Sequence, residues 1–211
     1  MEILEQSHQV LTPLLHESIY GIIERAGRTA YKSEDKITEG SAIIFIQNIL
    51  KRGHESVLEH ASVSVRFITD RGVTHELVRH RLCAFTQEST RYCNYYKRGM
   101  QFIKPAFWND MSKQSLSRLV MWELAMSDAE RCYNVMIQDG CKPEEARSVL
   151  PNSLKTEIVV TANIREWRHI FRLRTALTAH PQMRALMTPT LREFKEALPA
   201  LFTDFEVPNV L

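Results

Sequence analysis

Two segments of this chain have the pattern of a β-strand that passes through a core, and they lie far apart in the sequence. Residues 61–68 (ASVSVRFI) alternate between apolar and polar side chains. Their apolar members Val63, Val65 and Phe67 would share one face of a strand. Residues 157–163 (EIVVTAN) form a short apolar run typical of a buried strand. Because helical patterns dominate elsewhere, we predict a helix-rich α+β fold with a small central β-sheet, without the regular alternation of a doubly wound sheet.

Apolar residues recur at helical spacing over most of the chain, in residues 12–31, 41–53, 72–82, 112–138, 142–150, 164–177 and 181–194. Thr12 and Ser41 are the expected N-caps of the first two segments, and Gly53 is the expected stop of the second. Pro189 would perturb the last helix. A short strand is expected ahead of these helices, within residues 2–11.

The composition indicates one globular domain that spans residues 1–211. The chain has a mass of 24.5 kDa and 44% apolar residues, enough for a substantial core, and no Gly/Ser linker or repeat divides it. With 27 Lys and Arg against 25 Asp and Glu, the protein has no strong overall field that would recruit nucleic acid. Any anion site must therefore come from local clustering of cations.

The cysteines, the N-terminus and the hydropathy favour a cytoplasmic protein with no membrane partner. The cysteines show no CxxC spacing and a chain of this size does not need disulfide bonds, so we expect reduced thiols, at Cys83, Cys93, Cys132 and Cys141. The first ten residues lack the basic and apolar regions of a signal peptide. No apolar run approaches the length of a membrane span.

Arginine, histidine and hydroxyl side chains gather in residues 79–96 (RHRLCAFTQESTRYCNYY). Arg79, His80 and Arg81 are successive, and neighbours on a helix point about 100° apart, so the three can converge only at a helix end or on an irregular segment. The following TQESTRY run adds short hydroxyls and an arginine, which suit a phosphate. The alternative is a basic helix end on the surface.

The GHESVLEH segment carries His54 and His60 without a metal-binding motif. A zinc protease would have its second histidine where Leu58 stands, and the reversed motif would need histidine in place of Ser56. A turn after Gly53 therefore explains this segment better than a metal site, and we predict no metal.

Residues 163–174 (NIREWRHIFRLR) place an arginine among apolar side chains. The helical wheel has one apolar arc, made of Trp167, Ile170, Phe171, Leu173 and Leu177. Arg174 falls inside this arc. The other basic side chains fall on the opposite side, namely Arg165, Arg168, His169 and Arg172. A guanidinium on a core-facing stripe needs an anion or carbonyl partner, so Arg174 either binds a ligand or bridges to a carboxylate within the fold or between subunits.

Four ordered blocks of the sequence resemble the flavin-dependent thymidylate synthase (ThyX) family. RHR at residues 79–81, seven residues and then Ser89 match the family's RHR-X7-S signature. The likeness continues with GHESVLEH and STRY on either side of RHR, and with EEARSVLP and TANIREWRHIFRLR downstream, over residues 50–185. The resemblance implies the ThyX fold and reductive methylation of dUMP to dTMP, with methylenetetrahydrofolate as carbon donor and NADPH-reduced FAD as hydride donor. It also implies a homotetramer with active sites shared between chains.

The resemblance further implies roles for individual residues. Those matched to FAD contacts are Ser56, Arg79, His80, Arg81, Gln87, Asn163, Arg165 and His169. Those matched to dUMP contacts are Glu76, Arg79, Gln87, Ser89, Arg91, Arg147 and Arg174. His54 matches a position near the flavin ring, where folate would stack. The chain departs from the family pattern at Glu76 and Gln87, where family members often have glutamine and glutamate, and His169 replaces the asparagine of some members.

The implied catalytic residue is Arg174, which would polarise the uracil ring. A fixed cation beside N3 and O2 favours ionised uracil and makes C5 a carbon nucleophile. Arginine suits this role because it stays protonated. Neither Cys83 nor Cys93 has a base beside it in the sequence, in agreement with a route that needs no enzyme thioether. Ser89 lacks an adjacent His–Asp pair and is assigned to phosphate binding.

Other functions remain open from the residues alone. A nucleic-acid-binding protein would use RHR and the tyrosines for phosphate and base stacking, and would bind oligonucleotides with steep salt dependence. A structural oligomer would use the arginines for bridges between subunits, and a flavin reductase would lack methyl transfer. The chain has no GxGxxG or Walker motif, so a bound dinucleotide would not lie in a Rossmann fold.

Overall fold

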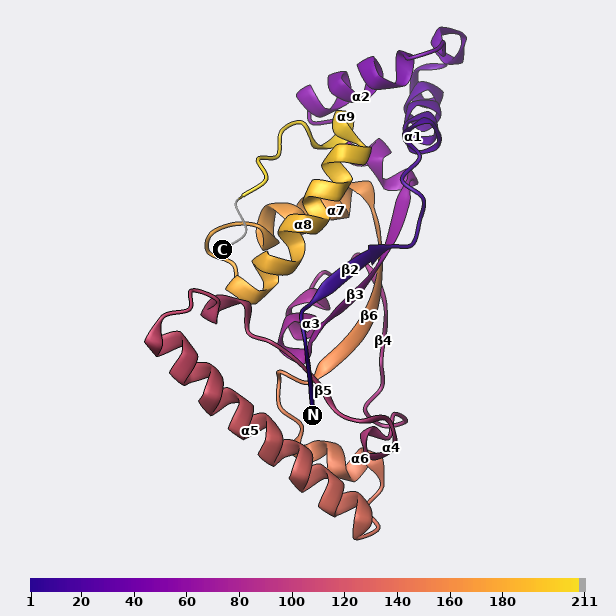
Figure 1. Cartoon of the computed structure of the whole chain (residues 1–211). Helices are drawn as coiled ribbons and strands as arrows, with labels where there is room; N and C mark the ends of the chain where they lie inside the picture. Colours follow the sequence, from indigo (N-terminus) through magenta and orange to yellow (C-terminus); the bar gives the residue numbers. More distant parts are fainter. Residues whose placement is uncertain (209–211) are drawn as a thin grey trace.

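A four-stranded antiparallel sheet lies at the centre of the computed structural model, which describes residues 1–208 (Figure 1). The strand order is β2–β3–β6–β4, with β2 at Ser7–Val10, β3 at Ser62–Asp70, β6 at Lys155–Asn163 and β4 at Ala84–Gln87. The two predicted strands, β3 and β6, form the central pair and are in register along their whole length. The predicted α+β fold with a small central sheet is confirmed.

The strand predicted near the N-terminus is divided in two. β1 (Glu2–Leu4) pairs in parallel with β5 (Gln101–Ile103) as a separate two-stranded sheet, and β2 follows it as an edge of the main sheet. The short strands β4 and β5 were not predicted. A segment of three or four residues is too short to show a clear alternation.

Helices lie along one side of the sheet and beyond both of its ends (Figure 1). The α-helices are α1 (His16–Tyr31), α2 (Ser41–Lys51), α3 (Arg71–Leu77), α4 (Tyr95–Arg98), α5 (Lys113–Gln138), α6 (Pro143–Ala146), α7 (Ile164–Arg174), α8 (Pro181–Ala197) and α9 (Pro199–Phe202). Short 3-10 turns form η1 (Glu34–Lys36), η2 (Glu55–His60), η3 (Ala106–Trp108) and η4 (Arg147–Val149). Among residues 1–208, no helix is both long enough and apolar enough to cross a membrane.

The main core fills the space between the sheet and helices α7 and α8. Val63, Val65 and Phe67 are fully buried on the inward face of β3, as their alternation predicts. Trp167 of α7 lies against Phe67 and donates its ring N–H to the carbonyl oxygen of Val63 at 3.0 Å. Phe194 of α8 packs on the same tryptophan. This aromatic packing fixes α7 against the sheet and so fixes the position of its C-terminal end.

A second, smaller core lies under α5, at the lower end of the sheet in Figure 1. It contains Tyr95, Phe102, Met126, Tyr133 and Leu154. Ser112 caps α5 by accepting a hydrogen bond from the backbone N–H of Ser115 at 3.1 Å. The loop after β4 lies at this lower end of the sheet, whereas α7 lies beside its upper part (Figure 1).

Several predicted helix boundaries were wrong. The first helix begins at His16 and not at Thr12, whose hydroxyl accepts from the backbone N–H of Ser64 instead. Ser41 is the first residue inside α2, and Gly40 takes the capping position with a φ of +75°. The helix predicted over 72–82 ends at Leu77, so the RHR triplet lies on an irregular segment.

The predicted apolar arc of α7 holds only in part. Leu173 and Leu177 are 48% and 83% exposed, because α7 ends at Arg174 and the chain leaves the core there. The fully buried arginine is Arg168, only 1% exposed, which the wheel had placed on the opposite side. Its guanidinium pairs with Asp204 of the C-terminal segment, and this long-range partner compensates its burial.

Candidate functional site

The RHR triplet does not present three side chains to one point. After α3 ends, the chain runs as turns, with Arg79 and Arg81 exposed and His80 buried. Asp70 holds the start of α3 by accepting from the backbone N–H of Val73 at 2.7 Å. The two arginines therefore face the surface, while the histidine ring lies inside the protein.

Arg174 is held by α3 and by the buried histidine. Its Nε donates to His80 Nε2 at 2.9 Å. Its Nη1 donates to Glu76 Oε2 at 2.9 Å, and its Nη2 donates to the Glu76 backbone oxygen at 3.0 Å. The side chain of Arg174 is 19% exposed, so it lies at a boundary and not in the core. The sequence left open whether Arg174 bridges to a carboxylate. Such a bridge is present within one chain, between Arg174 at the end of α7 and Glu76 of α3.

Burial and the contact with Arg174 favour a neutral His80 ring with its hydrogen on Nδ1. Burial first, and then the positive Arg174 and the nearby His169, lower the pKa of His80 to about 4. Since Arg174 donates to Nε2, that nitrogen has no hydrogen, and the ring N–H is on the opposite side. Nδ1 lies 3.3 Å from Oε1 of Glu166, a buried carboxylate of α7 whose pKa burial raises. Sequence reasoning did not select Glu166, although it lies inside the REWRH block.

His80, Glu166 and His169 bring possible metal-ligand atoms within 4.8 Å of one another. Both nitrogens of His80 are already engaged, since Nε2 accepts from Arg174 and Nδ1 faces the Glu166 carboxylate. A metal at either nitrogen would have to displace one of these contacts. The chemistry of this group therefore favours a hydrogen-bond chain, and the absence of a resident metal stays a prediction.

The predicted phosphate-binding residues Ser89, Arg91 and Arg147 meet at the lower end of the sheet. Arg147, at the start of η4, donates to the hydroxyl of Thr90 at 3.3 Å. The Ser89 hydroxyl accepts from the backbone N–H of Arg91 at 3.2 Å. Arg91 also lies 3.9 Å from Glu144. Thr90 was not singled out, but it lies inside the STRY motif and joins the two segments.

A hollow of about 790 Å³ lies between α1, α2 and η2, and both His54 and Ser56 line it. Arg52 and Lys36 bring positive charge to the same wall, and Tyr31 and Phe45 are among its aromatic members. The sequence predicted only the histidine and the serine here. Lys36 ends η1 and Arg52 follows the last residue of α2. Only the folded structure brings these two cations to the same hollow, so no local sequence pattern predicts them.

The remaining predicted cofactor residues lie at the start of α7. Asn163 caps the helix by accepting from the backbone N–H of Glu166 at 2.9 Å. Arg165 is exposed and donates to Glu59 of η2 at 2.5 Å. The exposed His169 ring packs edge-on against His80, with 5.7 Å between centroids. Together with η2, these residues form a surface next to the buried His80 ring.

The protein-family model described as "Thymidylate synthase complementing protein" matches residues 16–200 of the chain. The chain belongs to this family. Relatives named flavin-dependent thymidylate synthase come from several bacteria. The one from Geobacter sulfurreducens is 35% identical over 85% of this chain and 78% of its own length. Those from Mycobacterium tuberculosis and Corynebacterium efficiens are 35% and 34% identical, each over 90% of this chain and 80% of its own length.

One solved structure has the same fold as this chain. It is a UMP/dUMP methylase, PolB from Streptomyces cacaoi, bound with 5-Br dUMP, with a TM-score of 0.83. The alignment covers 99% of this chain and 100% of the other at 20% identity. A second structure of that methylase, bound with 5-Br UMP, has a TM-score of 0.79 over 97% of this chain and 96% of the other.

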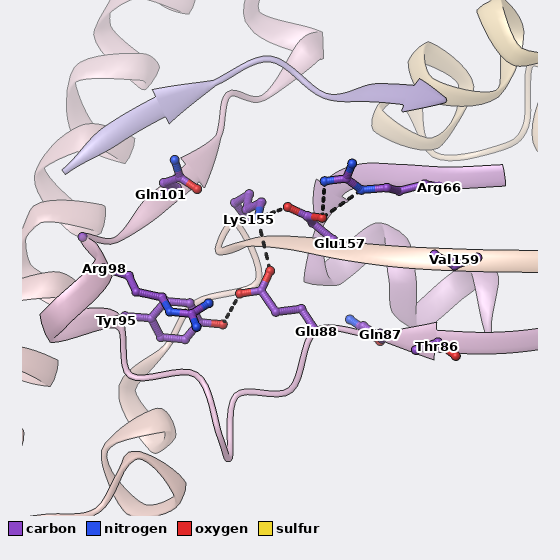
Figure 2. A pocket seen from close by; sticks show the side chains of 11 residues that line it. Arg66, Thr86, Gln87, Glu88, Tyr95, Arg98, Gln101, Lys155, Glu157 and Val159 are labelled. Atoms are coloured by element: carbon purple, nitrogen blue, oxygen red, sulfur yellow. Dashed lines mark hydrogen bonds and ion pairs between the residues drawn. The ribbon is translucent and has the colours of Figure 1, made fainter. Parts of the chain in front are cut away.

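The side-chain amide of Gln87 in this chain is hydrogen-bonded to two buried threonines. It donates to the hydroxyls of Thr74 at 2.9 Å and Thr156 at 3.3 Å. Gln87 and the next residue, Glu88, both line a hollow of about 460 Å³ on the outward face of β6 (Figure 2). Both hydrogen bonds of Gln87 use its amide nitrogen, so a contact of that nitrogen with dUMP or FAD would require them to break.

The charged side chains in the Figure 2 hollow largely satisfy one another. Lys155 donates to Glu88 at 3.2 Å and to Glu157 at 2.7 Å. The Tyr95 hydroxyl donates to Glu88, and Arg66 donates to Glu157. This network ties the loop after β4 to β6 and α4, and we assign it no ligand.

Proposed function

We propose that the chain catalyses the reductive methylation of dUMP to dTMP, with methylenetetrahydrofolate as carbon donor, FAD as cofactor and NADPH as reductant. The observation that carries this proposal is the guanidinium of Arg174, held in one orientation by His80 and Glu76 at a partly exposed site. Relatives of similar length named flavin-dependent thymidylate synthase support it, as does a fold relative bound with 5-Br dUMP.

The direct test is product formation by the purified protein. Incubation with dUMP, methylenetetrahydrofolate and NADPH should give dTMP, and omission of any of the three should prevent it. The protein should also show flavin absorbance. A colourless protein that forms no dTMP after FAD is added and binds oligonucleotides with steep salt dependence would favour the nucleic-acid alternative.

Arg174 is the proposed catalytic residue. The planar guanidinium would donate to the N3–O2 edge of uracil and stabilise the negative charge that activates C5. Arginine keeps its proton throughout, so it acts as a fixed cation and not as a base. Glu76 accepts from two of its nitrogens and thereby fixes the plane of the fork.

The side chains near Ser56 and α7 fit a dinucleotide with a diphosphate. Among the described residues, no hydrogen bond or ion pair engages the side-chain cations of Arg79, Arg81, Lys36 or Arg52. Such cations suit phosphate oxygens. We propose that the group from the sequence analysis, Ser56, Arg79, His80, Arg81, Gln87, Asn163, Arg165 and His169, surrounds FAD, which when reduced supplies the hydride. His54 would stack on the folate beside it.

Arg81→Ala should purify folded but with little bound FAD. Loss of one charge-assisted contact to a phosphate costs about 1.5–3 kcal/mol, or roughly 10- to 100-fold in affinity. Flavin absorbance per chain and a dissociation constant for added FAD measure the change. Arg118→Ala, which removes an exposed arginine of α5, is the matched control and should keep its flavin. Full flavin occupancy of Arg81→Ala would contradict the assignment.

Ser89, Arg91 and Arg147 are proposed to bind the dUMP phosphate, with Arg79 and Glu76 nearby on another chain. Among residues 1–208, no hydrogen bond or ion pair joins this group to Arg174. A homotetramer with shared active sites would bring both groups to one nucleotide. Large apolar side chains exposed on α5 offer an interface, among them Leu116, Val120, Met121 and Leu124. The mass of the assembly in solution tests this state.

We also propose that the protein works in the cytoplasm. Its cysteines are free thiols, in keeping with a reducing compartment. Fractionation of the source cells tests the location.

Cys83→Ala and Cys93→Ala should both retain dTMP formation. Burial, with the Glu166 carboxylate nearby, raises the pKa of Cys83 to about 12, so its thiol stays protonated and is a poor nucleophile at neutral pH. Turnover at saturating dUMP measures the effect, with flavin content as the control for folding. Complete loss in either variant, with flavin intact, would bring covalent catalysis by a thiol back into consideration.

A further inference from the structure

Glu166 is a buried carboxylate whose side chain has one partner. It is 6% exposed and lies on α7, two turns before Arg174. Among the described residues, its only recorded hydrogen-bonding or ionic partner is Nδ1 of His80, at 3.3 Å. A buried carboxylate with a single partner is costly for folding, so its presence needs a reason other than stability.

Glu166, His80 and Arg174 form a chain with one consistent arrangement of hydrogens. Arg174 can only donate, so His80 Nε2 must accept from it. The ring hydrogen is then on Nδ1, which lies 3.3 Å from the carboxylate oxygen Oε1 of Glu166. In the other tautomer, Nε2–H would meet the N–H of Arg174, and the bare Nδ1 would meet a carboxylate. Both contacts would be repulsive.

We propose that Glu166 is a positioning residue: it holds His80 in the Nδ1–H tautomer, so that Nε2 accepts from Arg174 and fixes its guanidinium. Glu76 holds the other two nitrogens of the guanidinium, so every nitrogen of the arginine has a partner. The fork is therefore oriented before substrate arrives, which lowers the reorganisation needed during the reaction. The catalytic consequence rests on the proposed role of Arg174, whereas the tautomer does not.

Glu166→Leu and Glu166→Gln separate the positioning role from a structural one. Leucine removes the acceptor and leaves the buried Nδ1 hydrogen of His80 unpaired, so the variant should fold but melt below the wild type. Its kcat for dTMP formation should fall roughly 10- to 100-fold, the size of one lost charge-assisted hydrogen bond. Glutamine can accept the Nδ1 hydrogen through its amide oxygen, so it should recover most of the rate. Both variants are assayed with saturating FAD, because His80 is also proposed to contact the flavin.

Glu193→Leu is the matched control. Glu193 accepts from His8 Nε2 at 2.9 Å, a second Glu–His pair that lies away from Arg174. Its loss should leave kcat within about twofold of the wild type, as expected of a surface pair. Nitrogen-15 NMR of the histidine rings gives a readout besides activity. His80 should show a protonated Nδ1 in the wild type and in Glu166→Gln, and a smaller share of this form in Glu166→Leu, where Arg174 alone still favours it.

Wild-type turnover in Glu166→Leu, or an equal loss in Glu166→Gln and Glu166→Leu, would overturn the positioning role. So would a wild-type His80 that carries its hydrogen on Nε2. If the wild type forms no dTMP, the proposed function fails, but the NMR result still decides whether Glu166 sets the tautomer.

Discussion

Arg174→Ala should reduce dTMP formation by at least about 10²- to 10³-fold, the usual effect of removing one preorganised donor from a developing negative charge. The loss should appear in kcat, because the interaction with uracil strengthens as the ring becomes negative. Oxidation of NADPH by the flavin should largely persist, since that step does not use uracil activation. Parallel assays of dTMP and NADPH therefore measure the effect and locate it.

The stability of Arg174→Ala should change little. Arg174 and Glu76 are both partly exposed, so the freed carboxylate can be hydrated and the loss should be about 1 kcal/mol or less. Arg174→Lys keeps the charge but loses the planar fork, and it should recover only part of the rate. Arg172→Ala is the matched control on the same helix, because its guanidinium is 49% exposed and lies against Asp204.

One combination of results would assign Arg174 to structure. If Arg174→Ala melts far below the wild type and yet methylates dUMP normally at low temperature, the bridge to Glu76 would be its purpose. The proposed mechanism would then have no group to polarise uracil.

The parts of the fold that were predictable are those with a strong local pattern. β3 alternates along its length, and α5 spans Lys113–Gln138, close to the predicted range of 112–138. The cap of α1 was missed because the Thr12 hydroxyl bonds to the distant β3 instead of the helix. Short strands such as β4 depend on pairing with β6, and their few residues carry no periodic signal.

The candidate site was predictable where motifs mark it, and less so where contacts cross the fold. The RHR motif marks a segment that contacts Arg174, and the STRY motif marks the group proposed to bind phosphate. The contact between Arg174 and Glu76 joins residues on α7 and α3, and no local pattern reveals it. The helical wheel also assigned burial by angle alone, and it missed Arg168, whose partner Asp204 lies in the C-terminal segment.

Arg168→Ala should lower the free energy of unfolding by about 3–5 kcal/mol, because a buried guanidinium loses its charge-assisted hydrogen bonds and leaves a cavity. Nη1 and Nη2 of Arg168 donate to the two carboxylate oxygens of Asp204 at 2.9 and 2.7 Å. The guanidinium also donates to the carbonyl oxygen of Leu201 and lies over the ring of Phe205. Its loss would leave a cavity and free the C-terminal segment from α7.

Urea unfolding followed by circular dichroism, at one fixed protein concentration, measures this change, since assembly would make apparent stability depend on concentration. Arg172→Ala also loses a contact to Asp204, but the loss of its exposed guanidinium should cost less than about 1 kcal/mol.

Burial tends to raise the pKa of Asp204, but the hydrogen bonds from Arg168 outweigh this effect and hold that pKa below its usual value. The contribution of the pair is therefore present at neutral pH and is lost as the pH falls through that lowered pKa. Wild-type stability should drop in acid by more than that of Arg168→Ala, and equal stability of the two proteins at pH 7 would show that the pair does not hold the C-terminal segment.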